Sequence, residues 1–446
     1  MRPSGELFYV TVSFGLVALI RLVSSVVLTR ILYPEAYGLV AIVSSIVFTV
    51  EMTSDLGVAT LMVRHEKAES DVYLSTLWTV RFLRSVINGG IVLLLAPILA
   101  EIYGTPELAL PLQFFSLFFL LQGLESMSLL RAIRNRKASK VSIIEVISLL
   151  LATAIAILVS LHTRDHVGMV VGIIVNRGAT TALSYALGGP FRPRFSLDRA
   201  VCRELFQIAR FVMPSSMLTM AISQFDKIIF LRLFDLTLLG LYGLAANVIQ
   251  AVDSIIVTLT QNVLTPQLAE AFRRDRSSAT RVYYRENARL HAFVLLLPAA
   301  VGGAAPLIVE VLFDPRYASA ALILQAFALR SVLLAFYSSS ENLLVASGHN
   351  HIGLMGNVLR AVWLMPGVLI GYRLFGFHGF LVMAVLYNVP GLCYYYWLQA
   401  REGLVVARYE VYRLALAGAV FAVTFGLVPL GSMALKALKA SLRSLV

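Results

Sequence analysis

Apolar stretches of membrane-crossing length recur along nearly the whole chain. Between residues 8 and 430 they alternate with short polar connectors. An α-helix needs about 20 apolar residues to cross the hydrocarbon core of a bilayer. Inside that core every backbone amide must be satisfied within its own segment, so these stretches should be helices. A chain of 446 residues with 59% hydrophobic and 14% charged residues fits no soluble globule. We therefore predict an all-α integral membrane protein.

The pattern predicts 12 to 13 transmembrane helices, twelve of them in two six-helix lobes. The first six are expected at 8–30, 37–62, 72–98, 107–130, 142–162 and 166–188. The next six are expected at 211–232, 238–262, 291–312, 320–346, 351–372 and 377–400, and a thirteenth at 411–430. The corresponding domains are an N-terminal lobe (1–190), a cytoplasmic amphipathic linker (191–210), a C-terminal lobe (211–400) and an extra helix with a basic tail (401–446).

The charged residues of the connectors predict the orientation. The connectors on the side of the N-terminus carry 22 Lys and Arg residues, and those on the opposite side carry 5. Positive residues mark the cytoplasmic side, so the N-terminus should lie inside. The net charge of +12 is then explained by topology and by anionic lipid headgroups, and it requires no nucleic acid. A thirteenth span would place the basic tail outside, against this rule, so either 411–430 is not a full span or 431–446 lies flat as an amphipathic helix.

An internal repeat supports the two-lobe arrangement. A shift of 202 residues superposes Arg30 on Arg232, Gly38 on Gly240 and Glu51 on Asp253. The same shift superposes the first two helices of each lobe in the same orientation. We therefore expect a parallel repeat with a pseudo-two-fold axis, as in transporters whose substrate site lies at the repeat interface.

Ionisable residues inside the predicted spans need partners, water or a function, because each costs about 2.5–3.5 kcal/mol at the centre of a helix. Several cations from both lobes converging on one cavity would attract a phosphate, which Arg can bind with two hydrogen bonds. For each one alone, an interhelical ion pair or an extension to the membrane surface explains its position equally well. The candidate substrate-binding cations are Arg21, Arg84, Arg177, Lys227, Arg330 and Arg360.

Four charged residues on the second and third helices form a further pattern. Asp55 should lie at the depth of Arg81, and Glu51 near that of Arg84, which suggests two structural ion pairs. In the alternative, one of these arginines faces water and binds an anion. Glu51 and its repeat partner Asp253 are candidates for coupling to a proton or sodium ion, because buried carboxylates can exchange protons. Ordinary salt bridging is the alternative for both.

The chain contains no Walker loop, HExxH, GxSxG or metal-binding aspartate pair. We therefore expect no catalytic residue, no metal site and no cofactor. The connectors expected outside the membrane are too short for a catalytic domain, which disfavours a membrane polysaccharide polymerase or ligase.

Four segments carry a family resemblance: TRILYPEAYGLVAI (29–42), TSDLGVATLMVR (53–64), PLIVEVLFDPRYASA (306–320) and SENLLVASGHNHIG (340–353). They resemble bacterial polysaccharide transporters and O-antigen flippases of the multidrug/oligosaccharidyl-lipid/polysaccharide exporter superfamily. Asp314 departs from the pattern, in which glycine is commoner.

The resemblance implies two lobes forming a V around a central cavity. It also implies a flippase that moves polyprenyl-diphosphate-linked oligosaccharide across the cytoplasmic (inner) membrane for exopolysaccharide, capsule or O-antigen assembly. Membrane lipids, a polysaccharide polymerase and export machinery are the other candidate partners. A lipid II flippase and a multidrug/cation antiporter of the same superfamily are the alternatives, and an arginine-bearing cavity disfavours the second.

Overall fold

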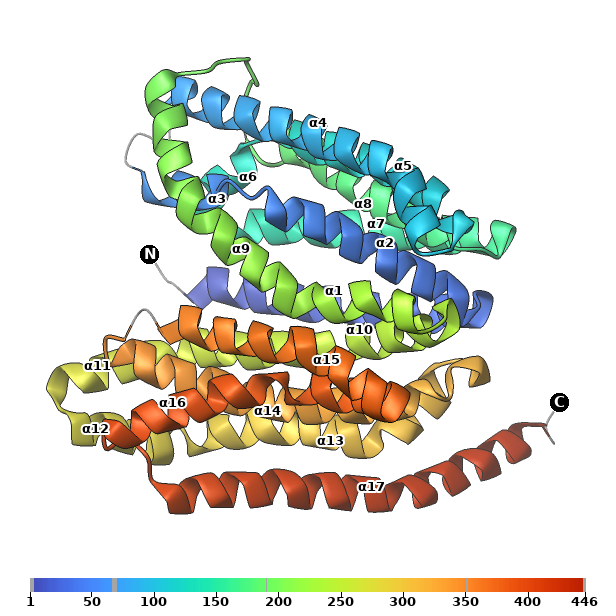
Figure 1. The fold of residues 1–446 in the computed structure, drawn as a ribbon, viewed down its shortest axis with the longest axis vertical. Helices are drawn as coiled ribbons and strands as arrows, with labels where there is room; N and C mark the ends of the chain where they lie inside the picture. The colour runs from blue at the N-terminus through green and yellow to red at the C-terminus, as the bar shows by residue number, and fades with distance from the viewer. Residues whose placement is uncertain (1–3, 66–69, 136, 190, 350–351, 444–446) are drawn as a thin grey trace. The chain divides into compact units, whose positions relative to one another are not determined.

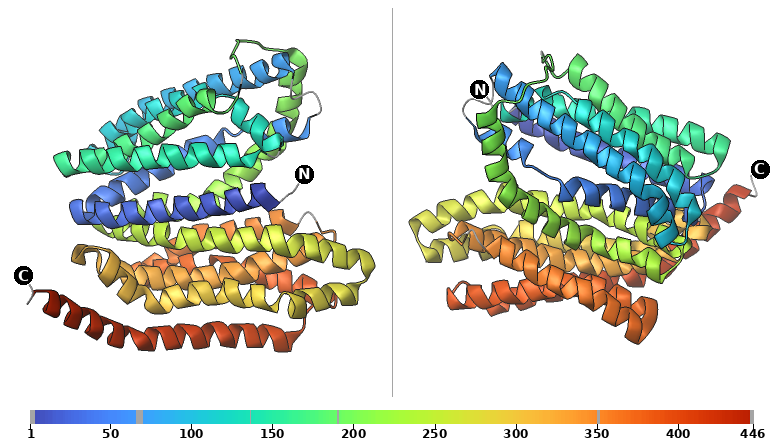
Figure 2. Two further views of the ribbon diagram at one scale, coloured as in Figure 1. Left: turned by 180° about the vertical axis from the view of Figure 1, so that it is seen from behind. Right: turned by 45° about the horizontal axis from the view of Figure 1, so that its top comes forward.

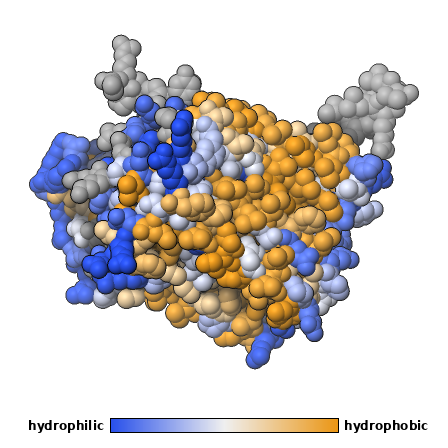
Figure 3. Space-filling model, turned by 90° about the horizontal axis from the view of Figure 1, so that it is seen from above, coloured by the Kyte–Doolittle hydropathy of each residue, from blue (hydrophilic) through white to orange (hydrophobic). Residues whose placement is uncertain are grey.

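The protein is entirely helical over the residues that the structure describes. The computed structural model describes residues 4–65, 70–135, 137–189, 191–349 and 352–443, and no β-strand occurs among them (Figure 1). Eleven segments of this described chain are long and apolar enough to cross a membrane. Figure 3 shows apolar residues gathered in a band on one face of the molecule, with hydrophilic residues on both sides of the band. The predicted all-α membrane fold is confirmed.

The helices follow the predicted spans closely. Helix α1 (Ser4–Ile31) covers the first predicted span. One long apolar segment, Ile352–Arg401, contains the two spans predicted at 351–372 and 377–400. They are separated within α15 (Ile352–Val385), where Phe375 and Gly376 have non-helical backbone angles. Gly376 has φ of 58°, a left-handed conformation that glycine adopts without steric cost.

Contacts divide the chain into two units, residues 1–240 and 241–446. In unit 1, α1 packs beside α7, α7 beside α8, α4 beside α5 and α2 beside α9, an arrangement that Figures 1 and 2 show from several sides. After α1, the helices of unit 1 are α2 (Pro34–Thr53), α3 (Val58–Arg64), α4 (Asp71–Ile102), η1 (Pro106–Leu108), α5 (Ala109–Leu124), α6 (Ser128–Arg134), α7 (Ala138–Thr163), α8 (Val167–Ala186) and α9 (Arg199–Leu233).

Helix α10 (Leu236–Leu259) begins in unit 1 and continues into unit 2. In unit 2, α13 packs against α14 and α17, and α14 also packs against α15 and α16. The helices that follow α10 are η2 (Thr260–Leu264), α11 (Thr265–Arg274), α12 (Arg276–Arg281), η3 (Val282–Glu286), α13 (Ala288–Leu312), η4 (Pro315–Tyr317), α14 (Ala320–Ala346), α15, η5 (Leu386–Asn388), α16 (Val389–Arg401) and α17 (Ala407–Arg443).

The segment predicted as an amphipathic linker has a different structure. Residues 191–198 are extended, and a single helix, α9, runs from Arg199 to Leu233. The extended part lies along α4, because the backbone N–H groups of Ser196 and Asp198 donate to threonine hydroxyls of that helix. Asp198 then caps α9 by accepting from Ala200 and Val201. No separate helix covers 191–210, and the role of this segment as a cytoplasmic linker stays a prediction. The predicted lobe boundaries and the V-shaped central cavity stay predictions.

Two of the predicted spans are each divided into two helices. The span expected at 37–62 divides into α2 and α3, and the span expected at 107–130 divides into α5 and α6. Gly57, at the first break, has φ of 73°, and its N–H donates to the Asp55 carboxylate (3.0 Å). At the second break, the N–H of Ser126 donates to the Ser184 hydroxyl on α8 (3.0 Å). Non-helical backbone occurs at membrane depth only where such internal partners satisfy it.

The repeat register predicted from the sequence corresponds to a close contact in unit 1. A Cβ atom on Gly38 would lie 2.1 Å from the Leu236 carbonyl oxygen, and one on Gly240 would lie 1.8 Å from that of Pro34. The predicted repeat superposes Pro34 on Leu236 and Gly38 on Gly240. The two contacts are therefore reciprocal: Gly38 meets Leu236, and Gly240 meets Pro34. Residues superposed by the predicted repeat therefore meet where α2 contacts the start of α10, and the two-fold relation itself stays a prediction.

Candidate functional site

The break between α2 and α3 holds the first of two intramembrane charge clusters. Arg84, on α4, lies 3.7 Å from the Asp55 carboxylate and donates to the carbonyl of Ser54 (3.3 Å). Asp55 also accepts from the hydroxyl of Ser216 on α9 (2.9 Å). The Nε atom of Arg84 is buried and has no hydrogen-bond partner. Arg84 is thus a partly satisfied guanidinium inside a membrane-spanning helix.

The second acidic residue of the first charge cluster is Glu125, which lies at the break between α5 and α6. The Glu125 carboxylate accepts from Arg81 at 2.9 Å and from Arg177, on α8, at 3.3 Å. Arg81 also donates to the Gln122 carbonyl (2.9 Å). The Arg177 guanidinium lies over the ring of Phe118, 4.6 Å from its centroid. One carboxylate therefore binds two arginines that come from different helices.

These contacts correct the pairing expected from depth alone. Asp55 pairs with Arg84 rather than with Arg81, whose partner is Glu125. Glu51 accepts a hydrogen bond from the Gln122 side-chain amide. Asp55 lies directly before the break at Gly57, so its carboxylate is not where a continuous helix would place it. Glu51 lies within α2 and interacts electrostatically with Arg84, and that expected pair stays a prediction.

The other two candidate cations of unit 1 lie on α9 and α1. Lys227, on α9, donates to Gln224 (3.3 Å), which in turn accepts from Ser45 on α2 (2.9 Å). Arg21, on α1, is exposed, and no carboxylate lies within 4.0 Å of it among the described residues.

Unit 2 holds the second charge cluster. Asp253, on α10, lies 3.7 Å from Arg330 and accepts a hydrogen bond from the hydroxyl of Ser331, both on α14. The predicted repeat superposes Glu51 on Asp253. Glu51 accepts from Gln122 on α5, and Asp253 accepts from Ser331 on α14. The Arg330 guanidinium also lies 4.3 Å from the centroid of the Phe327 ring.

Arg360, on α15, is held by neutral groups. It donates to Asn357 (3.1 Å) and to the hydroxyl of Tyr387 (2.9 Å). Its guanidinium lies 4.5 Å from the ring centroid of Tyr337 and 4.7 Å from that of Tyr387. Within the described residues, no carboxylate lies within 4.0 Å of it, and its buried Nε has no partner. Cation–π contacts stabilise a desolvated guanidinium by about 2 kcal/mol without neutralising its charge.

Sequence reasoning did not assign Tyr337, Tyr387 or Gln122 to the site. Neutral partners leave no charge pattern in the sequence, so no signal pointed to them. Glu125 was detectable as an acid inside a predicted span, but its pairing with Arg81 and Arg177 was not. In the part of the chain that the structure describes, no group of three or more His, Cys, Asp or Glu side chains could hold a metal ion. The two cysteines, Cys202 and Cys393, are free.

The many apolar spans, the broken helices and the arginines inside the membrane region define a multi-pass membrane protein of the transporter class. Its fold is similar to that of the lipid II flippase MurJ in an inward closed conformation, with a TM-score of 0.68, 12% identity, and coverage of 94% of this chain and 98% of that one. It is also similar to an inward-facing multidrug resistance MATE family transporter, with a TM-score of 0.58, 13% identity, and coverage of 88% and 94%.

The chain belongs to the family of polysaccharide biosynthesis proteins, whose model matches residues 27–322. Among its relatives, the succinoglycan biosynthesis transport protein ExoT of Rhizobium meliloti is 26% identical over 403 residues, which are 88% of this chain and 78% of that protein. The amylovoran biosynthesis protein AmsL of Erwinia amylovora is 22% identical over 305 residues, which are 66% and 78%.

Proposed function

We propose that this protein is a flippase that carries polyprenyl-diphosphate-linked oligosaccharide repeat units across the cytoplasmic membrane by alternating access. Its family supports a role in polysaccharide biosynthesis, and two relatives are named for the assembly of exopolysaccharides. The fold supports transport, since its structural neighbours are transporters. The charge clusters support a cargo with an anionic group that must enter the membrane interior.

Arg360 carries this proposal. A guanidinium inside a span normally has a carboxylate partner, because an unpaired charge there is costly. The direct contacts of Arg360 are two tyrosine rings and two neutral acceptors, and the carboxylates of Glu341 and Asp253 act on it only from beyond 4.0 Å, so no direct ion pair occupies its guanidinium. A diphosphate would supply the missing negative charge and accept from the unpartnered Nε. We propose Arg84, with its unpartnered Nε, as the equivalent contact in unit 1, and Arg21, Arg177, Lys227 and Arg330 as supporting cations.

The same observation disfavours one of the two alternative functions and leaves the other open. A cationic drug would be repelled by Arg360, which disfavours a multidrug/cation antiporter. A lipid II flippase would need the same diphosphate contact, so Arg360 does not distinguish its cargo from a longer oligosaccharide. That distinction comes from measuring which lipid-linked saccharide accumulates in the inner leaflet when the gene is deleted.

The test uses full-length protein in proteoliposomes that contain a fluorescent polyprenyl-diphosphate saccharide. Arg360→Gln should lower the rate of translocation at least tenfold, because it removes the unpaired charge. Arg360→Lys should retain part of the rate, since it keeps the charge and loses the two-pronged geometry. The matched control is Arg373→Gln, which removes an exposed arginine from the same helix and should leave the rate unchanged. Equal rates for Arg360→Gln and wild type would remove the diphosphate contact from the proposal.

Coupling to an ion is a separate part of the proposal. Glu51 and Asp253 are related by the repeat, and each accepts a hydrogen bond from a neighbouring helix that a protonated carboxyl would change. Glu51→Gln and Asp253→Asn should make translocation insensitive to an imposed proton or sodium gradient. If the translocation rate of the wild-type protein responds to neither gradient, the coupling role is excluded and the flippase assignment is unaffected.

A further inference from the structure

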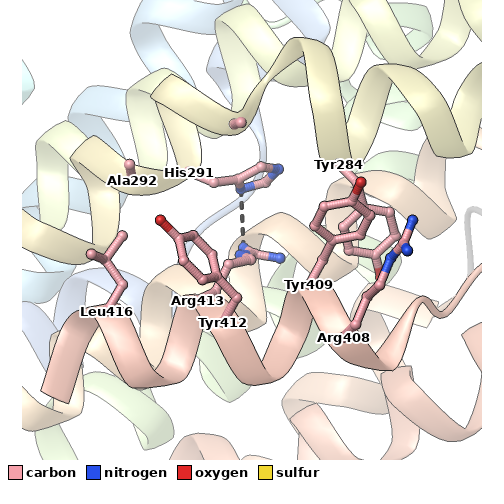
Figure 4. Close-up of a pocket in the computed structure, with 9 residues that line it drawn as sticks. Tyr284, His291, Ala292, Arg408, Tyr409, Tyr412, Arg413 and Leu416 are labelled. Atoms are coloured by element: carbon pink, nitrogen blue, oxygen red, sulfur yellow. Dashed lines mark hydrogen bonds between the residues drawn. The ribbon is translucent and has the colours of Figure 1, made fainter. Parts of the chain in front are cut away.

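A cavity lies between α13 and α17 in unit 2, away from both charge clusters. Its volume is ≈ 380 Å³, and Figure 4 shows the side chains on its wall. Further along, the two helices touch closely: a Cβ atom on Gly303 would lie 1.7 Å from the Thr424 hydroxyl. Toward Ala288 and Ala292 on one helix and Leu416 on the other, they separate and leave the cavity. Its wall there is apolar, as an acyl chain requires.

The buried arginine of the cavity wall is already neutralised. Arg413 pairs with Glu410 at 3.0 Å and donates to the Tyr283 hydroxyl at 3.3 Å. It also donates to Nδ1 of His291 at 3.0 Å, the bond drawn in Figure 4, so that this nitrogen must be an acceptor. A histidine that accepts at Nδ1 is neutral. Arg413 therefore fastens α17 to α13 and offers no charge to a ligand.

Two other arginines contact Tyr409, which lines the cavity, and have no acidic partner within 4.0 Å among the described residues. Arg408 lines the cavity, and its guanidinium lies 4.9 Å from the centroid of the Tyr409 ring. Arg285 donates from Nε to the hydroxyl of the same tyrosine (3.3 Å). Both arginines are exposed, and among the described residues no carboxylate lies within 4.0 Å of either. Two guanidinium groups without an acidic partner within 4.0 Å among the described residues thus contact Tyr409 at the opening of the cavity.

The surroundings place this opening at a membrane surface. It lies at the start of α17, in the first turns of a candidate span, on the side where the connectors are rich in Lys and Arg. Tyr284, Tyr409 and Tyr412 line it, and tyrosine is typical of the boundary between hydrocarbon and headgroups. The Tyr412 side chain is 64% exposed, so the cavity opens toward lipid.

We propose that this cavity binds one anionic glycerophospholipid, with its phosphate between Arg285 and Arg408 and the upper part of one acyl chain against Ala288, Ala292 and Leu416. A basic pocket between transmembrane helices at the headgroup level is suited to an anionic lipid. The apolar wall excludes a free phosphate as the natural occupant, because the phosphate would leave that wall uncovered. The bound lipid fastens α17 to α13, and the site is independent of the proposed transport function.

Native mass spectrometry of the purified full-length protein tests the proposal, with phosphatidylglycerol as the probe and phosphatidylethanolamine as the zwitterionic reference. Wild-type protein should retain phosphatidylglycerol at least fivefold better than phosphatidylethanolamine. The double variant Arg285→Gln/Arg408→Gln should lose this preference. The control Arg401→Gln removes an exposed arginine near the same surface, whose guanidinium lies over Trp397 instead, and should keep the preference.

A second variant tests the apolar wall without changing the charge. Ala292→Trp fills the cavity and should lower retention of phosphatidylglycerol at least fivefold, with a wild-type elution profile in detergent. The proposal is overturned if the arginine variant keeps the preference, if Arg401→Gln loses it equally, or if the filled cavity retains the lipid. Displacement of phosphatidylglycerol by millimolar inorganic phosphate would also overturn it, since the site would then bind phosphate rather than a lipid.

Discussion

At the scale of single residues, the intramembrane charges separate into satisfied and unsatisfied groups. Glu125 binds Arg81 and Arg177 and is itself nearly buried, so these three residues form a structural network. Arg84 and Arg360 each keep a buried Nε without a partner. All five residues are charges inside predicted spans, but their expected roles differ. The network around Glu125 should control stability, and Arg84 and Arg360 should control transport.

A double-mutant cycle measures the first of these roles. Breaking a buried ion pair by removing one partner costs about 3–5 kcal/mol, because it leaves an uncompensated charge. Glu125→Gln and Arg81→Gln should therefore each destabilise the protein, and the double variant should recover about 1–3 kcal/mol of coupling. Reversible unfolding in mixed micelles gives the free energies. The cycle Asp55→Asn with Arg81→Gln is the control and should show coupling near zero; strong coupling there would restore the pairing expected from depth alone.

At the scale of helices, close contacts depend on particular glycines. Gly38 and Gly240 allow the backbones of α2 and α10 to touch, and a methyl group at either position would overlap a carbonyl oxygen. Gly302 and Gly303 have the same role between α13 and α17, where Phe421 and Thr424 approach them. Small residues let transmembrane helices approach closely and gain dispersion energy.

Alanine substitutions at two glycines test this interpretation. Gly38→Ala should lower the melting temperature of the purified protein by several degrees, because the backbones must separate. Gly90→Ala is the matched control, since a Cβ atom there meets no atom within 4 Å. In the control, the gain in helix propensity of about 0.5–1 kcal/mol should leave the melting temperature unchanged or slightly raised. Equal effects of the two substitutions would show that the α2–α10 contact is not tight.

At the scale of the whole molecule, the orientation in the membrane is a prediction from charge. The connectors with 22 Lys and Arg residues should face the cytoplasm. Helix α17 continues as one helix to Arg443, so the basic tail does not form a separate helix, and its position flat on the membrane stays a prediction.

Cysteine labelling of intact cells with an impermeant reagent tests this orientation. In a background of Cys202→Ser and Cys393→Ser, Thr163→Cys lies on an outer connector and should be labelled. Ser139→Cys and Ser196→Cys should be labelled only after the membrane is permeabilised. Labelling of either in intact cells would reverse the predicted topology.

The sequence by itself determined the all-α membrane fold and the place of most of its long apolar helices. These follow from hydrophobicity over about 20 residues and from spacing along the chain, which are local properties. The extended segment at 191–198 was missed because its partners, threonines of α4, lie over a hundred residues away.

Only the tertiary structure decided which charges meet. The rotation of a helix about its axis, and the breaks at Asp55 and Glu125, are set by packing against distant segments. An estimate of depth along the helices therefore predicted that Asp55 pairs with Arg81, whereas in the structure Asp55 pairs with Arg84. In the same way, nothing along the chain distinguishes Arg360 from its fellow cations. Its tyrosine neighbours and its lack of a carboxylate among the described residues arise because α14, α15 and η5 meet around it.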